Sequence, residues 1–192
     1  SGIYIKELTN VGGRLVTTSK WNNTVVLEVS DTTLMDKVKE MPFVTGVKKV
    51  WAQPDSIPPR NKKRKKEVTN EVQKTPNHYG NAFFQASLHG ADSLHAAGFT
   101  GQDMHVAVID AGFYNADKIK FFKKINLLGT RDFVNPKSDI YEENAHGMMV
   151  LSCMAANMKD VFVGTAPEAS YWLLRSEDQD TEQPVEEDYW AA

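Results

Sequence analysis

Cysteine is almost absent from this sequence, and long hydrophobic runs are absent altogether. Cys153 is the only cysteine, which excludes an intrachain disulfide framework and any zinc site built from several cysteines. No stretch of eighteen apolar residues is present, so no membrane-spanning helix is predicted. The formal net charge of -3 gives no overall basic field. Any case for nucleic-acid binding must therefore rest on a local patch.

The two ends of the sequence each carry a signal. The chain begins with Ser-Gly-Ile, without an initiator methionine or a charged and then apolar leader, so we expect that a leader was removed or that the start was engineered. Near the other end, Pro184 and the acidic residues that follow Val185 are typical of a helix start, because acids near the first turn complement the helix dipole. Barely two turns remain before Ala192, and we expect the natural product to continue.

The first fifty residues have the pattern of a small α+β unit. Residues 23–29 are rich in β-branched side chains and alternate in the manner of a strand. A helix should follow, with apolar side chains at helical spacing until Pro42. Residues 43–51 are apolar enough to return as a second strand. The pattern therefore predicts a β-α-β element, a small sheet covered by a helix.

The composition changes abruptly over residues 54–76. Several prolines and a basic run, residues 60–66, leave nothing apolar to bury, which indicates a linker. Three roles are open for the basic run: a solvated connection, an exposed site for a protease that cuts at Lys or Arg, and a phosphate-binding patch for nucleic acid. Nucleic acid ranks last, because no interleaved aromatic residues or recognised nucleic-acid motif accompany the charges.

From Tyr79 onward the pattern becomes that of an α/β fold. Residues 85–97 are predicted to form a helix, and residues 104–110 a strand apolar enough to be buried on both faces. A second helix over residues 147–157 and another buried strand over residues 169–174 follow. Because these strands need helical crossovers, we expect a largely parallel sheet with helices on its faces, and chemistry at the carboxyl ends of its strands.

Asp110 closes the first of these strands, and His146 opens the second helix. Such a pair suggests two thirds of a catalytic triad, in which the aspartate holds the imidazole in one tautomer and the free ring nitrogen takes a proton from a serine. Glycines near each residue would let backbone and substrate approach closely. Taken alone the signal is weak, since strand-end aspartates are more often turn residues and single histidines more often structural.

The residues around both positions resemble the subtilisin-like serine proteases, the subtilases of the peptidase S8 family, over most of residues 79–169. Several blocks follow the family pattern in order and spacing: Tyr79-Gly80, Gln85, Leu94-His95, Gly98, Thr100-Gly101, Val106-Ala-Val-Ile-Asp-Ala-Gly112, His146-Gly147, Val150, Ala155-Ala-Asn157 and Gly164-Thr-Ala-Pro-Glu-Ala-Ser170. Two positions depart from it, with Met148 where threonine is usual and Ala111 where serine or threonine is usual. Neither departure removes a member of the triad.

The resemblance implies an α/β fold class: part of a largely parallel, subtilisin-like sheet with flanking helices, preceded by a small α+β, ferredoxin-like propeptide domain. In the family such a propeptide assists folding and then inhibits the protease, so the chain would be part of a zymogen. On this basis we expect a propeptide in residues 1–53, a basic linker and candidate processing region in 54–76, and the N-terminal part of a catalytic domain in 77–192.

The resemblance also implies the chemistry. Asp110 would orient His146, which would act as general base and then general acid for a serine nucleophile that hydrolyses peptide bonds. The family's Gly-Thr-Ser-type motif and its oxyanion asparagine have no counterpart here, and Ser152, Ser170 and Ser176 lack that context. We therefore expect the 192 residues alone to be inactive, with the serine supplied downstream.

The expected partners are peptide or protein substrates, the C-terminal catalytic part with its serine, and the propeptide packed on the catalytic domain. A truncated sheet also predicts association between copies. The implied location is secreted, or in the cell envelope or periplasm of a bacterium. Two other function classes stay open: a non-catalytic protease inhibitor, folding chaperone or pseudoenzyme, and nucleic-acid binding through the basic linker.

No cofactor and no metal ligand is assigned. Calcium is a candidate in the complete enzyme, since many subtilases bind it in a loop after the histidine helix. Here that loop, residues 158–164, carries few oxygen-bearing side chains. His78, His89, His95 and His105 lack the paired spacing of a zinc site.

Overall fold

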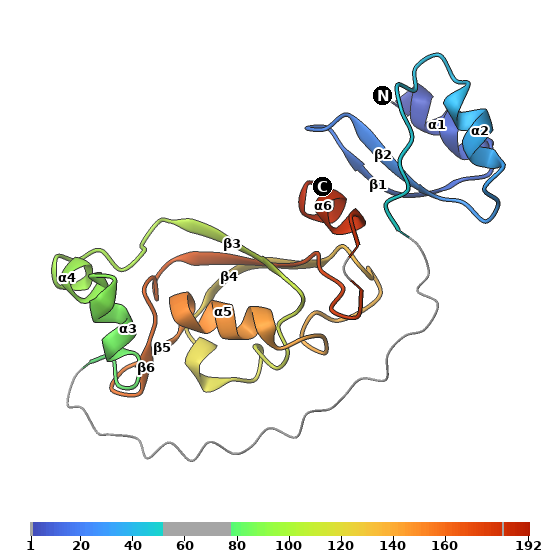
Figure 1. Ribbon diagram of the computed structural model, residues 1–192. Helices are drawn as coiled ribbons and strands as arrows, with labels where there is room; N and C mark the ends of the chain where they lie inside the picture. Colours follow the sequence, from blue (N-terminus) through green and yellow to red (C-terminus); the bar gives the residue numbers. More distant parts are fainter. Residues whose placement is uncertain (1, 52–77, 182) are drawn as a thin grey trace. The chain divides into compact units, whose positions relative to one another are not determined.

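The computed structural model describes residues 2–51, 78–181 and 183–192 (Figure 1). The chain divides into two compact units, Ser1–Ile57 with Asp180–Ala192, and Pro58–Gln179. The predicted linker lies outside the described residues. Within the described ranges, none of the helices has both the length and the apolar character needed to cross a bilayer.

The first unit combines helices with one antiparallel hairpin. Its elements are α1 (Gly2–Asn10), β1 (Arg14–Ser19), β2 (Thr24–Glu28), α2 (Leu34–Lys39) and α6 (Val185–Trp190). Strands β1 and β2 pair antiparallel, while Leu8 of α1 and Val38 of α2 are buried. The small α+β region predicted at the N-terminus is thereby confirmed.

The order of elements inside this region differs from the prediction. Residues 43–51 form no strand, and β2 pairs instead with β1, which the pattern had not indicated. A hairpin closes only a short loop, so it costs less entropy than a return across a helix. Asn23 in the turn has φ of 53°, a left-handed conformation that asparagine tolerates well. The predicted β-α-β element is therefore wrong.

Helix α6 belongs to the first unit although it ends the chain. Pro184 directly precedes it, and acidic residues occupy its first turn, as predicted. Val185 is 4% exposed, and its amide donates to the carbonyl of Val50 at 3.1 Å. Burial is the main cause that raises the pKa of the Asp188 carboxyl, and the charge of Glu187 adds to it.

The second unit is built on a parallel sheet of β3 (His105–Asp110), β4 (Asn126–Asp132) and β7 (Ser170–Arg175) in the order β3-β7-β4. Both pairings are parallel, which confirms the predicted sheet type. The sequence had not indicated β4, because Gly129 and several polar residues interrupt its apolar pattern. Gly129 leaves the room that the ring of Trp172 occupies, since a Cβ there would lie 2.5 Å from that ring.

Helix α5 (His146–Ala155) packs on the sheet and forms the main core with it (Figure 1). The innermost side chains of this core come from the helix, the strands and the segment after β3: Val108, Phe113, Leu151, Tyr171 and Leu173. The prediction of a strand buried on both faces is wrong for β3, whose side chains alternate between exposed and covered. Ile109, Leu127 and Trp172 are 39–43% exposed.

The single helix predicted over residues 85–97 is divided in two. Helices α3 (Phe83–Leu88) and α4 (Ala91–Ala96) meet at Gly90, whose φ of 70° is left-handed and ends the helical path. A short 3-10 turn, Lys120–Phe122, precedes β4. Strands β5 (Asn157–Met158) and β6 (Phe162–Val163) form a small hairpin after α5.

Candidate active site

Asp110 is the last residue of β3, and its carboxylate is almost completely enclosed, with 8% of the side chain exposed. Its Oδ1 accepts a hydrogen bond from the amide of Ala111 at 2.7 Å. Its backbone carbonyl accepts another from the amide of Ser176 at 3.1 Å. The strand end thus fixes both the backbone and the side chain of this residue.

His146 is the first residue of α5, and its ring faces the carboxylate of Asp110. Nδ1 lies 2.9 Å from Oδ1 and 2.9 Å from Oδ2 of that aspartate. The backbone amide of His146 donates to Oδ1 of Asn144 at 2.7 Å, which anchors the start of the helix. A carboxylate can only accept, so this contact places a proton on Nδ1, and in the neutral imidazole Nε2 then carries a free lone pair. The side chain of His146 is 61% exposed, which keeps Nε2 open to a reacting group.

Two glycines bring the strand end and the helix start together. A Cβ on Gly147 would lie 2.6 Å from the carbonyl oxygen of Gly112 and 2.8 Å from Cβ of Asp110. A Cβ on Gly112 would lie 2.5 Å from the amide nitrogen of Asn144, and its φ of 148° also disfavours other residues. The close approach of Asp110 and His146 therefore depends on the absence of side chains at these two positions.

The loop that leads into α5 is fixed to the segment that follows β3. Three successive amides of residues 113–115 donate to its carbonyls at 2.8–3.0 Å, with Ile140, Asn144 and Tyr141 as the acceptors. The two halves of the pair are thus linked through backbone as well as through side chains.

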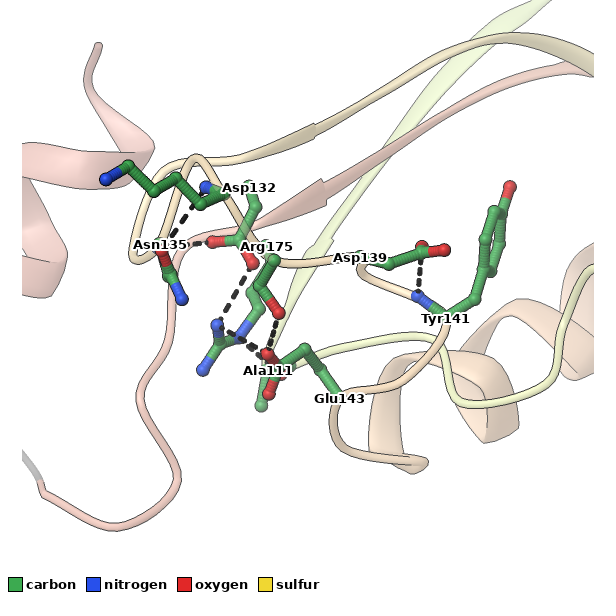
Figure 2. A network of polar contacts seen from close by, with 9 residues as sticks. Ala111, Asp132, Asn135, Asp139, Tyr141, Glu143 and Arg175 are labelled. Atoms are coloured by element: carbon green, nitrogen blue, oxygen red, sulfur yellow. Dashed lines mark hydrogen bonds and ion pairs between the residues drawn. The ribbon is translucent and has the colours of Figure 1, made fainter.

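A buried arginine contacts the residue that follows Asp110, and the sequence had not indicated it (Figure 2). Arg175 ends β7, and 8% of its side chain is exposed. Its Nε donates to the carbonyl of Ala111 at 3.0 Å, and its Nη1 donates to Oδ2 of Asp132 at 3.0 Å. The same Nη1 lies 3.5 Å from Oε1 of Glu143. A charged residue at the end of an apolar strand was the signal that could have pointed to it.

The serines of this region do not complete a triad among the described residues. Ser152 donates to the carbonyl of Met149 at 2.6 Å within α5. Ser170 opens β7, at the opposite end of the sheet from Asp110, and accepts from Asn126 at 2.6 Å. Ser176 is 1% exposed, and its Oγ has no hydrogen-bond partner in the part of the chain that the structure describes. None of these hydroxyls contacts the ring of His146.

Both ring nitrogens of His95 take part in hydrogen bonds that join separate segments of the chain. Its Nδ1 lies 2.8 Å from the hydroxyl of Tyr79, and its Nε2 lies 2.9 Å from the carbonyl of Thr165. Over the residues that the structure covers, no three His, Cys, Asp or Glu side chains are grouped to hold a metal ion. Residues 158–164, considered above for calcium, form the turn and strands of the β5–β6 hairpin.

Comparison with known proteins gives two kinds of match. Residues 1–70 match the family model described as the peptidase S8 propeptide domain of Bacteroidota. Subtilisin E of Bacillus subtilis (strain 168) is 32% identical over 87 residues, which cover 44% of this chain and 22% of that protein. Subtilisin J of Geobacillus stearothermophilus is 31% identical over the same length and the same shares. The match thus spans about a fifth of the length of these relatives.

The two matches agree with the structure. The propeptide model covers the small α+β region, and the parallel sheet with its helices is consistent with part of a subtilisin domain. The chain therefore combines an N-terminal region that matches the peptidase S8 propeptide model with a segment that is similar, over part of its length, to the subtilisins.

Proposed function

We propose that the protein containing this chain is a subtilisin-like serine endopeptidase, in which His146 moves the proton and Asp110 orients it. The observation that carries the proposal is the contact of Nδ1 of His146 with both carboxylate oxygens of Asp110, at 2.9 Å each. This contact directs Nε2 away from the aspartate, where it can take a proton from a hydroxyl and return it to a leaving amine.

The electrostatics of the pair support this role. A carboxylate enclosed by protein stabilises an adjacent imidazolium more strongly than one in water, because fewer water molecules screen the attraction. The aspartate is enclosed while the histidine is open, so the charge that forms on the ring during proton transfer is stabilised on the Nδ1 side only. Substrate can then approach from the Nε2 side.

We further propose that the nucleophilic serine comes from a part of the protein outside these 192 residues, since the subtilisin match covers only 22% of the relatives. A propeptide domain of this family implies a catalytic domain against which it packs. The Bacteroidota propeptide match indicates a bacterial source, and we propose secretion or export to the cell envelope. Residues 1–70 would then act as an inhibitor until they are removed.

The test uses the complete protein after removal of its propeptide, with a denatured protein and a peptide ester as substrates. Asp110→Asn should lower kcat about 10⁴-fold, because the asparagine amide favours the wrong tautomer of the histidine. His146→Ala should lower it at least as far. His105→Gln is the matched control, because His105 is exposed at the opposite end of the same strand.

The outcome also separates the alternatives. If the processed wild-type protein neither cleaves substrate nor reacts with a serine-directed fluorophosphonate, the protease proposal is wrong. Tight inhibition of a separate subtilisin by the inactive chain would then favour an inhibitor.

A further inference from the structure

We propose that Arg175 is a positioning residue for the Asp110–His146 pair. Its guanidinium binds the backbone just after Asp110, at Ala111, and the loop before His146, at Glu143 (Figure 2). The inference rests on the proposed function, because it concerns the geometry of the pair assigned there. Among the described residues, the guanidinium contacts Ala111, Asp132 and Glu143 and not the ring of His146, so it acts through other residues.

The first contact acts on Asp110 through Ala111. The amide of Ala111 donates to the carboxylate of Asp110 at 2.7 Å, while its carbonyl accepts from Nε of Arg175 at 3.0 Å. Residue 111 is therefore bound at both ends, by the carboxylate on one side and by the guanidinium on the other. The amide of Ser176 also holds the peptide group between Asp110 and Ala111, so loss of the contact to Arg175 releases the next peptide group, after Ala111, and lets the turn that follows Asp110 shift.

The second contact acts on His146 through the loop before it. Glu143 lies 3.5 Å from Nη1 of Arg175 and also binds the hydroxyl of Ser138. In the next residue, Asn144, the side-chain oxygen Oδ1 accepts a hydrogen bond from the backbone amide of His146 at 2.7 Å. Glu143 is thus the point at which the guanidinium reaches the segment that anchors the start of α5.

The sheet register places Arg175 between two aspartates. Arg175 ends the central strand, and its register partners on the two neighbouring strands are Asp110 and Asp132. Parallel strands lie about 4.8 Å apart, so these three buried side chains form one row at the carboxyl edge. The guanidinium is paired with the carboxylate of Asp132 in this row, and its removal would leave that buried carboxylate without its cation.

Arginine fits this place better than lysine would. The guanidinium donates from Nε to the carbonyl of Ala111 and from Nη1 to the carboxylate of Asp132, and 8% of the side chain is exposed. A lysine keeps the charge but offers a single flexible ammonium group in place of this planar fork. The exchange of arginine for lysine therefore separates positioning from charge.

The experiment uses Arg175→Lys and the charge-balanced double variant Arg175→Met with Asp132→Asn, both in the complete, processed protein. The double variant guards against unfolding, because it leaves no buried carboxylate of that ion pair without its cation. We expect kcat to fall about 10- to 100-fold in each variant, with KM little changed, because displacement of reacting groups by about 1 Å costs up to 100-fold.

A spectroscopic readout tests positioning independently of turnover. In protein labelled with ¹⁵N at histidine, the Nδ1 proton of His146 should give a far-downfield resonance in the wild type. We expect this resonance to broaden or vanish in both Arg175 variants. Val163→Ala is the control for general destabilisation, because Val163 is 1% exposed in a separate core cluster and should leave the resonance and kcat unchanged.

Each result decides between the two proposals. An active wild type, together with wild-type kcat and an unchanged resonance in folded Arg175 variants, overturns the positioning role and leaves the protease proposal intact. An inactive wild type whose resonance is lost in the Arg175 variants overturns the protease proposal, while the effect of Arg175 on the pair stands.

Discussion

Gly147→Ala should disrupt the candidate active site by steric overlap alone. The added Cβ would lie 2.6 Å from the carbonyl oxygen of Gly112 and 2.8 Å from Cβ of Asp110. Carbon atoms pack at about 3.5–4.0 Å, so the helix start must move by about 1 Å. A shift of this size at His146 should lower kcat/KM about 100-fold. Overpacking should also cost about 1–3 kcal/mol of unfolding free energy, which the better helix propensity of alanine offsets only in part.

The assay compares kcat/KM and denaturant unfolding of the complete protein with and without the substitution. His105→Gln is the control, because His105 lies in the catalytic part, is exposed at the opposite end of β3 from Asp110, and should change neither quantity. Wild-type activity and stability in Gly147→Ala would refute the close packing of α5 against the end of β3.

Two further predictions concern the core of the second unit. Leu151 of α5 is 0% exposed, so Leu151→Ala should lower the unfolding free energy by about 2–5 kcal/mol in urea titrations, and a loss below 1 kcal/mol would contradict the packing. Burial raises the pKa of Tyr171 to about 12, while an unfolded tyrosine has a pKa of about 10. The unfolded state therefore loses this proton first as the pH rises, and the unfolding free energy should fall between about pH 10 and pH 12. Tyr171→Phe should flatten that fall and cost about 1 kcal/mol at neutral pH, because the hydrogen bond to Ala166 is lost; an equally steep fall in the variant would contradict it.

The local pattern succeeded where one strong signal dominated. The apolar run ending at Asp110 and the helix beginning near His146 lie within a residue or two of the predicted places. The start of α6 after Pro184 was equally readable, because capping chemistry is local. The division of residues 85–97 at Gly90 was missed, since only the backbone conformation shows that this glycine is left-handed.

Pairing between strands was harder to predict. β1 looked no more strand-like than residues 43–51, yet it is β1 that pairs with β2. Gly129 in β4 leaves room for the ring of Trp172 on the neighbouring strand, and the sequence of β4 alone does not show that this room is needed. These choices depend on contacts between segments distant in the chain, which a local pattern does not contain.

The sequence by itself determined the family resemblance, the type of sheet and the identity of Asp110 and His146 as the candidate pair. These follow from motifs and from hydrophobic periodicity, which are properties of neighbouring residues. Only the tertiary structure decided that Nδ1 of His146 meets both carboxylate oxygens, and that the buried guanidinium of Arg175 binds the carbonyl of Ala111, the residue after Asp110. Strand register placed Arg175 between Asp110 and Asp132, and register is fixed by how whole strands pack together.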